Sequence, residues 1–332
     1  MKNIKIAIIG VGGRTGAMFT FELKNRANVL GVAREKEIEM IAQKKLYIHR
    51  KEQEPQLLDC KIIKDSDFKS DLAPDVVFIT TKNPVYNVVK YYFEKFKNKK
   101  TPILFLSQNG VDALNDTKKA LQDIYGQKAE DITIIRSVLF NPIDVKAENN
   151  NVCVKYSLPI RIAVSKAQGQ EDIKSIIKTF RSAGFEVQQF SKANARNLEF
   201  SKLFLNLIGM ISASYNLSVK NGFKDKNIFQ QEAKALKEYI EVVKKSDARF
   251  INFSNYPVKI YSFLIDLIPI FFLVPVRNIL AKFISKGRKE KAKDLDEIEY
   301  YNGSVVKLGK ETKTRTPINE FVLKRVFNNS KS

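Results

Sequence analysis

Cysteine and histidine are nearly absent from this chain of 332 residues, in which Cys60, Cys153 and His49 are the only examples. Two cysteines so far apart exclude a disulfide scaffold and a C-x-x-C metal site, and they fit the reduced cytoplasmic compartment. His49 lies in the charged stretch LYIHRKE, where we expect a surface or packing role. The sequence therefore disfavours histidine-based dehydrogenase mechanisms and zinc alcohol dehydrogenase chemistry, and predicts no metal site. An enzyme built on this chain needs another proton donor, and lysine is the natural candidate.

Long hydrophobic runs are also lacking. The most apolar segment, residues 262–284, has an uninterrupted apolar run of only ten residues, Leu267 to Val276, and this run contains Pro269 and Pro275. A spanning helix needs about twenty such residues, so the segment does not span a membrane. We expect core packing or a homodimer contact here, with shallow membrane association as the alternative.

Basic residues are abundant, and they give the chain a formal net charge of +21. A nucleic-acid-binding protein would gather this charge on one face with interleaved aromatics, whereas these lysines occur in every segment. We therefore expect a solvated surface that also steers anionic ligands, with no nucleic-acid partner. The clearest basic cluster comprises Lys282, Lys286, Arg288, Lys289, Lys291 and Lys293.

The order of apolar segments predicts two domains. Hydrophobic residues make up 44 % of the chain, enough for two cores. Short apolar strands alternate with helices up to about residue 192, which is typical of an α/β fold, whereas helical periodicity follows throughout. We predict a Rossmann-like dinucleotide-binding domain over 1–192 and an all-helical substrate domain over 193–332. Within the first domain, we expect strands at 28–33, 75–80, 102–106, 132–138, 152–164 and 186–190, helices at 14–24, 85–96 and 171–182, and an irregular excursion at 45–64.

A glycine-rich turn follows the first predicted strand in NIKIAIIGVGGRTG, a start that does not resemble a signal peptide. Glycines let backbone N–H groups approach a pyrophosphate at a helix N-terminus, where the helix dipole favours an anion. Gly10, Gly13 and Gly16 fit a G-x-x-G-x-x-G frame, although Thr15 occupies the last glycine position of G-x-G-x-x-G. Together with Gly12, they predict a dinucleotide site, with a plain tight βα corner as the alternative.

Cofactor choice is indicated by the end of the second predicted strand, VLGVAR, where Arg34 precedes Glu35. An acidic residue at this point holds the ribose 2′-hydroxyl of NAD, whereas a basic residue favours a 2′-phosphate. The sequence therefore favours NADPH over NADH.

Several ordered motifs make the chain similar to the ketopantoate reductase (2-dehydropantoate 2-reductase) family along nearly its whole length. They are the glycine turn, NVLGVAR, ITTK, SQNG, EFSKLFLN and the stretch DEIEYYNGSVVKLGKETKTRTPINEFV. Ser285 lies twelve residues before Glu297, the separation expected of the family's substrate-binding serine.

The resemblance implies a role for each matching residue. Lys202 would donate the proton to the ketone oxygen, and Glu297 would be the carboxylate near that lysine and the substrate. Asn109 would place substrate and nicotinamide, while Asn206 and Ser285 would bind the substrate. Two further basic residues would face the cofactor's 2′-phosphate, namely Arg34 and Lys82. Independently of the family, Lys202 and Asn206 are four apart and share a helix face.

We expect an NADPH-dependent reductase of a 2-keto acid, with 2-dehydropantoate as substrate, acting in pantothenate and coenzyme A biosynthesis. Met210 falls where family members carry a second asparagine, and it motivates a second reading, a reductase of another 2-keto acid or a hydroxyacid dehydrogenase-like enzyme. A third is a non-catalytic, membrane-associated NADPH-binding protein. Retention of Lys202, Asn109, Ser285 and Glu297 together argues against this third reading.

Overall fold

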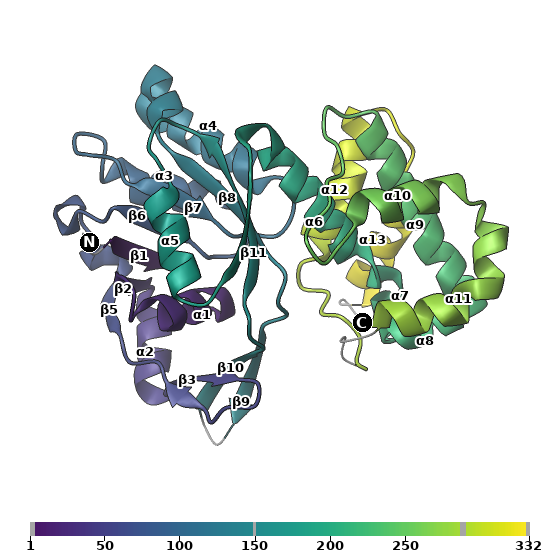
Figure 1. Ribbon diagram of the computed structural model, residues 1–332, viewed down its shortest axis with the longest axis horizontal. Coiled ribbons are helices and arrows are strands. Elements are labelled where there is room, and N and C mark those ends of the chain that lie inside the picture. Colours follow the sequence, from purple (N-terminus) through teal and green to yellow (C-terminus); the bar gives the residue numbers. More distant parts are fainter. Residues whose placement is uncertain (1–3, 149–150, 286–289, 330–332) are drawn as a thin grey trace. The chain divides into compact units, whose positions relative to one another are not determined.

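The computed structural model describes residues 4–148, 151–285 and 290–329 (Figure 1). The chain divides into two compact units, one formed by Met1–Gln108 and Ala113–Ala195 and the other by Asn109–Asp112 and Arg196–Ser332. The first unit is α/β and the second is helical, which confirms the predicted fold class.

An eight-stranded sheet forms the centre of the α/β unit. Its order is β12-β11-β8-β7-β6-β1-β2-β5, and all neighbours are parallel except β11 and β8. The strands are β1 (Lys5–Ile9), β2 (Asn28–Ala33), β5 (Lys61–Lys64), β6 (Val76–Ile79), β7 (Ile103–Leu106), β8 (Ile134–Leu139), β11 (Arg161–Gln168) and β12 (Glu186–Phe190). The carboxyl ends of the central parallel strands meet at one edge, where ligands bind in such sheets.

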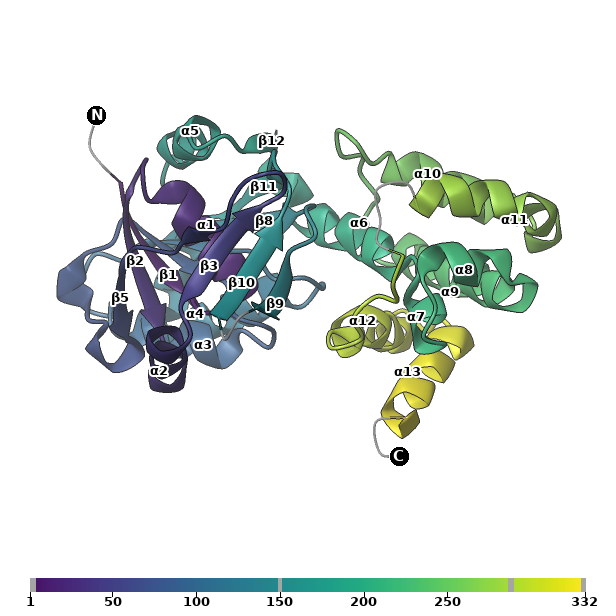
Figure 2. The same cartoon turned by 90° about the horizontal axis from the view of Figure 1, so that it is seen from below.

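Helices cover both faces of this sheet because its strands are apolar on both sides. Ile6 and Ile8 of β1 pack with α1 (Arg14–Leu23) and α5 (Lys174–Ser182), whereas Ala7 and Ile9 pack with the opposite helices. Those opposite helices are α3 (Tyr86–Glu94) and α4 (Ala113–Tyr125). Figure 2 shows the two helix pairs on opposite sides of the strands. Short 3₁₀ turns are η1 (Asp65–Asp67), η2 (Ser70–Leu72), η3 (Gly126–Asp131) and η4 (Lys192–Asn194).

The prediction of an irregular excursion over 45–64 is wrong. This stretch contributes β5 to the main sheet, and it forms half of a second sheet of order β4-β3-β10-β9. The strands of the small sheet are β3 (Leu46–Arg50), β4 (Gln56–Leu57), β9 (Asp144–Glu148) and β10 (Asn151–Tyr156). The predicted strand 152–164 is accordingly two strands, β10 and β11, in different sheets. The parallel partner of β3 is β10, so its pairing is non-local and no short-range pattern announces it.

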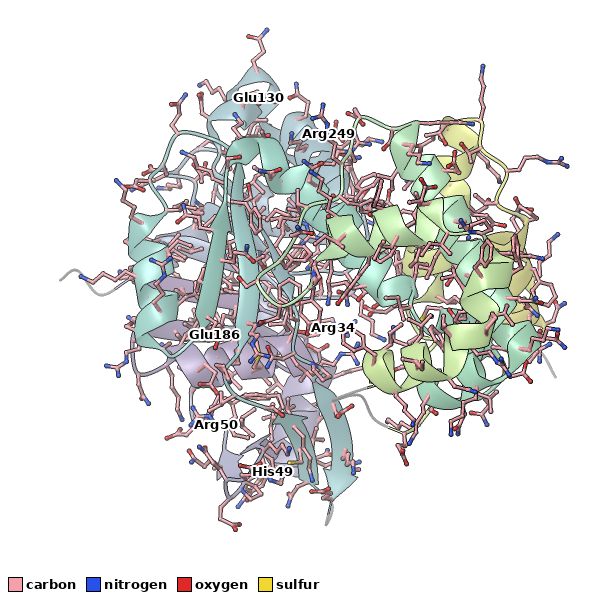
Figure 3. All side chains as sticks on the ribbon, turned by 45° about the vertical axis from the view of Figure 1, so that its right-hand side comes forward. Arg34, His49, Arg50, Glu130, Glu186 and Arg249 are labelled. Carbon is pink, nitrogen blue, oxygen red and sulfur yellow. The ribbon has the colours of Figure 1, made fainter. Side chains whose placement is uncertain are left out.

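Glu22 ties the small sheet to α1. Arg50 donates to both carboxylate oxygens of Glu22 at 2.8 Å, and the Tyr156 hydroxyl donates to Oε1 at 2.5 Å. This contact satisfies a buried carboxylate, as its burial requires. His49 also lies on the small sheet, next to Arg50 in β3 (Figure 3).

The helical unit is organised around α9, which packs against six other helices of the same unit: α7, α8, α10, α11, α12 and α13. Its helices are α6 (Ala195–Leu207), α7 (Met210–Ser214), α8 (Val219–Lys224), α9 (Lys226–Lys244), α10 (Val258–Leu267), α11 (Ile270–Ser285), α12 (Ile298–Glu311) and α13 (Pro317–Asn329). Among the described helices, none is long and apolar enough to cross a bilayer. Core packing, one of the expectations for residues 262–284, is wrong for the outer face of α10 and α11, where large apolar side chains are exposed.

Candidate active site

The glycine turn joins β1 to α1 in the geometry that a phosphate-binding corner requires. Gly10 has φ +87°, and its N–H donates to Val32 O at 2.9 Å. A Cβ at Gly16 would lie 2.2 Å from Gly10 O, so only glycine lets the helix start this close to the turn. Gly13 is the N-cap of α1, and it provides no side chain to cap the first N–H groups. These residues fit the pyrophosphate of a dinucleotide, which binds backbone N–H groups at a helix N-terminus.

The ends of β1 and β6 meet at this turn. Thr80 Oγ1 donates to Ile9 O at 2.6 Å, and a Cβ on Gly10 would approach Thr81 Cγ2 at 3.1 Å. Lys82 follows in the next position and is exposed. The structure therefore brings Lys82's segment beside the glycine turn, within the α/β unit.

Arg34 lies at the end of β2, as N-cap of a helix that the sequence analysis did not predict, α2 (Glu35–Gln43). Its guanidinium donates to Glu37 Oε1 from Nη2 at 2.6 Å and from Nε at 3.2 Å. The hydrogen bond from Arg34 to Glu37 raises the pKa of the guanidinium further. Figure 3 labels Arg34 among the side chains. Glu35, the first acidic residue after β2, pairs with Lys64 at 2.6 Å.

Glu37 is a residue that the sequence analysis missed. A Cβ on Gly12 would lie 3.3 Å from Glu37 Cβ, so this acid stands against the glycine turn. The capping-box spacing, three residues after the N-cap, could have indicated it.

A second cluster lies in the helical unit and joins side chains from distant parts of the sequence. Asn109 Nδ2 donates to Glu297 Oε2 at 3.1 Å, and Tyr301 OH donates to the same oxygen at 2.7 Å. Asn206 Nδ2 approaches Asn109 Oδ1 at 3.4 Å. The structure thus brings together three of the predicted site residues, Asn109, Asn206 and Glu297. It adds Tyr301, which lies one turn after the N-cap Glu297 in α12 and could have been found by that spacing.

The segment Asn109–Asp112 is held to α12 by a further contact. Lys307 Nζ lies 2.6 Å from Asp112 Oδ1. The preceding residue, Gln108, donates from Nε2 to Ile79 O at 2.7 Å at the end of β6. Asn109 therefore directly follows a residue that is hydrogen-bonded to the end of β6 in the main sheet.

Lys202 and Asn206 lie on one face of α6. Both are half-buried, whereas Leu203, Phe204 and Leu205 between them are buried. The spacing of four residues places the lysine one turn before the asparagine, as predicted. Lys202 therefore lies on the same face of α6 as Asn206, the residue that approaches Asn109 and thereby the Asn109–Glu297 pair.

The carboxyl end of α6 is fixed by two buried or half-buried charges. Lys293 Nζ donates to Asn206 O at 2.7 Å and to Ile208 O at 3.0 Å, so this lysine caps the helix. Its assignment to a solvated basic cluster is therefore wrong. Glu232 accepts from Gly209 N at 3.2 Å and from Ser212 N at 2.8 Å, and burial raises the pKa of its carboxyl.

Two further residues named from the sequence, Met210 and Ser285, lie in the helical unit. Met210 begins α7 and is fully buried, so it is a core residue of the helical unit. Ser285 is the last residue of α11, and its side chain lies outside the described residues, as do Lys286, Arg288 and Lys289. Across the ranges that the structure describes, no group of three or more histidine, cysteine or acidic side chains could hold a metal ion.

Comparisons with known proteins find a matching family model and similar folds. The family model described as ketopantoate reductase PanE/ApbA matches residues 6–138. A PanE/ApbA family ketopantoate reductase from Ralstonia eutropha JMP134 has a similar structure, with 15 % identity, 98 % of this chain and 99 % of that chain covered, and a TM-score of 0.72. A 2-dehydropantoate 2-reductase from Geobacter metallireducens GS-15 has 18 % identity, 98 % and 100 % coverage, and a TM-score of 0.66.

A third similar structure is a ternary complex of D-mandelate dehydrogenase with NADH and anilino(oxo)acetate. It has 17 % identity, 98 % of this chain and 97 % of that chain covered, and a TM-score of 0.64. The search of curated proteins found no match. At these identities the solved structures establish the fold alone.

Proposed function

We propose that the protein reduces a 2-keto acid to a 2-hydroxy acid with NADPH. The match of residues 6–138 to the ketopantoate reductase PanE/ApbA family model supports this proposal. The proposed substrate is 2-dehydropantoate, and the product is pantoate, a precursor of pantothenate and coenzyme A. We assign cofactor binding to residues 1–192, substrate binding and proton donation to residues 193–332, and the activity to the cytoplasm.

NADPH, when bound, supplies the hydride for the carbonyl carbon. The glycine turn would hold the pyrophosphate with backbone N–H groups, because Gly16 keeps the helix start open to it. Arg34 and Lys82 would bind the 2′-phosphate as cations.

Lys202 would act as the general acid on the ketone oxygen. An ammonium group near developing alkoxide charge both stabilises that charge and supplies the proton. Asn206 and Ser285 would bind polar groups of the substrate. Asn109 would orient the substrate, and its amide is held by Glu297, whose carboxylate also accepts from Tyr301.

The observation that carries this proposal is the Asn109–Glu297 hydrogen bond on the Asn206 side of α6. This bond places amide and carboxylate groups beside the α6 face that also bears Lys202, and keto-acid reduction needs such groups near a proton donor. A protein that only binds a nucleotide does not need them.

The test is NADPH oxidation by the purified protein against a panel of 2-keto acids that includes 2-dehydropantoate. The expected result is the highest kcat/KM with 2-dehydropantoate. A higher value with another keto acid would assign the enzyme to that substrate, the alternative that Met210 motivates. Absence of turnover with every member, in protein that binds NADPH, would overturn the proposed activity.

A further inference from the structure

Exposed large apolar side chains gather on the outer face of α10 and α11. Nine large apolar side chains of these two helices are between 41 % and 68 % exposed. They are Ile260, Phe263, Leu264, Leu267, Phe271, Phe272, Val276, Ile279 and Phe283. We call them the α10–α11 stripe.

The stripe has the spacing of a helix-packing surface. On α10 its members recur at steps of three and four from Ile260 to Leu267, and on α11 they do so from Phe272 to Phe283. Such spacing places side chains along one side of each helix, the arrangement that packs against other helices. The inner sides are already used, because α11 packs against α8 and α9, and α10 packs against α9 (Figures 1 and 2).

Charge is scarce along the stripe. Residues 258–284 contain Asp266 and three basic residues, Lys259, Arg277 and Lys282. Asp266 pairs with Lys244 at 2.7 Å, and Arg277 donates to Lys224 O at 3.0 Å. A helix that lies on an anionic bilayer carries a polar face rich in lysine and arginine, whereas the core of a protein interface is depleted of charge. Within the stripe the composition therefore favours a protein partner, although Lys286, Arg288, Lys289 and Lys291 follow it directly in sequence.

The exposed area is that of an interface. At about half exposure, each side chain offers roughly 100 Å², so the stripe offers roughly 900 Å². The largest apolar patch of a monomer is about 300–600 Å², while each partner of a standard interface contributes about 800 Å². We propose that the α10–α11 stripe is covered by the same stripe of a second copy, in a twofold homodimer with four helices at its centre.

The test is the mass of the protein in solution over a concentration series. We expect twice the chain mass of 38.0 kDa for the wild type and the mass of one chain for the double variant Phe272→Glu, Ile279→Glu. Both substituted side chains are more than 60 % exposed, so the folded monomer tolerates the change. The control is Val145→Glu, since Val145 is 51 % exposed on β9 in the α/β unit, and this variant should remain dimeric.

A wild type that stays monomeric at every concentration would overturn the proposal, and so would a dimer that persists in the double variant. Sedimentation of the monomer with vesicles of anionic lipid would identify a bilayer as the occupant instead. Because each chain is strongly basic, added salt should strengthen the dimer by screening repulsion.

A second inference concerns cofactor choice and rests on the proposed function. The Arg34 guanidinium already has a carboxylate partner in Glu37, and the pair as a whole is neutral. Glu37 Oε2 also accepts from the backbone N–H of Arg34 at 3.2 Å, so the carboxylate is held at the end of β2. This is the point where an acid binds the ribose 2′-hydroxyl of NAD.

We infer that Glu37 is a specificity-determining residue that weakens the preference for NADPH. A 2′-phosphate must displace the carboxylate from Arg34 and lie beside a negative charge, whereas a 2′-hydroxyl can donate to that carboxylate. Gly12 lets the Glu37 side chain lie against the glycine turn, because a side chain at position 12 would crowd it. The protein therefore also accepts NADH.

The test is the dissociation constant of each nucleotide, measured by fluorescence titration. Glu37→Gln keeps the size of the side chain and its capping capacity, and should raise the ratio of NADH to NADPH dissociation constants roughly tenfold. Glu35→Gln is the matched control, because Glu35 is on the same helix but pairs with Lys64, and the ratio should stay at the wild-type value. Arg34→Ala should weaken NADPH and leave NADH nearly unchanged.

An unchanged ratio in Glu37→Gln, or an equal change in Glu35→Gln, would overturn this inference. Its failure is distinguishable from that of the proposed function. Wild-type protein that binds neither nucleotide would refute the proposed function, whereas a ratio moved by Glu37→Gln without turnover of any keto acid would uphold Glu37's role alone.

Discussion

Asn109 and Glu297 are 188 positions apart in sequence, yet their side chains share a hydrogen bond of 3.1 Å. The segment Asn109–Asp112 belongs to the helical unit, although the preceding residue, Gln108, belongs to the α/β unit. A hydrogen bond to a carboxylate fixes which amide atom is the donor. Asn109 therefore keeps its Oδ1 toward Asn206, and the orientation of its amide is fixed.

A double-mutant cycle tests this coupling. Asn109→Ala and Glu297→Ala should each lower kcat/KM, and the double variant should lose less than the sum of the two losses. The coupling energy should be about 1 kcal/mol or more, because the hydrogen bond has a charged acceptor. Asn109→Ala combined with Glu241→Ala is the control and should be additive, because Glu241 is a half-buried partner of Lys244 on α9. Additive losses for Asn109 and Glu297 would show that the contact does not act in catalysis.

Alanine substitutions at Gly16 and Gly303 test the glycine turn, because the first is crowded and the second is not. Gly16→Ala places a Cβ 2.2 Å from Gly10 O, so the turn must distort, and both NADPH binding and the melting temperature should fall. Gly303→Ala, inside α12, meets nothing closer than 3.8 Å, and it should stabilise the protein by about 0.5–1 kcal/mol through helix propensity. Thermal melts with and without NADPH measure both effects. A Gly16→Ala protein with wild-type NADPH affinity would contradict the assignment of the turn.

Local patterns allowed much of the fold to be predicted. The buried strands around Ile6 to Ile9 and Val76 to Ile79 are apolar on both faces, and this composition distinguishes a covered parallel sheet. The i, i+4 relation of Lys202 and Asn206 is equally local, because it depends only on helix geometry. The link between Asn109 and Glu297 is not local, and only the family resemblance suggested that both serve one site.

The features that could not be predicted depend on contacts between residues far apart in sequence. The partner of β3 is β10, about a hundred residues later, so LYIHR does not reveal which strand it will join. In the sequence Lys293 is indistinguishable from a surface lysine, because its two carbonyl partners at the end of α6 are brought to it only by the fold. Glu37 is different, since its spacing from Arg34 is local and matches a capping box.

Cys60 gives a pH-dependent prediction. Burial raises the pKa of its thiol from 9.0 to about 11. The thiolate is the reactive form, so at neutral pH alkylation should be roughly a hundredfold slower than in the unfolded chain, and it should accelerate as the pH rises toward that pKa. Labelling by iodoacetamide, followed by mass spectrometry, measures the rate, and Cys60→Ser assigns the signal. Fast labelling of the folded protein at neutral pH would contradict the burial of this thiol.

The general-acid role of Lys202 is tested by Lys202→Ala. NADPH binding should remain almost intact, because the ammonium group is assigned to the ketone and not to the phosphates. Turnover should fall by roughly 10²–10⁴-fold, the usual contribution of a positioned proton donor. Some loss of substrate affinity should accompany it, since the ammonium lies near the substrate's anionic end in the proposed arrangement.

Lys245→Ala provides the matched control for charge. Lys245 is an exposed lysine at the end of α9, so its removal lowers the net charge equally without touching the α6 face. Its kcat should equal the wild-type value, which separates a local role of Lys202 from general electrostatic steering. Lys202→Ala protein that turns over its best keto acid at a rate close to the wild type would refute both the proton-donor role and the residue correspondence with the ketopantoate reductase family.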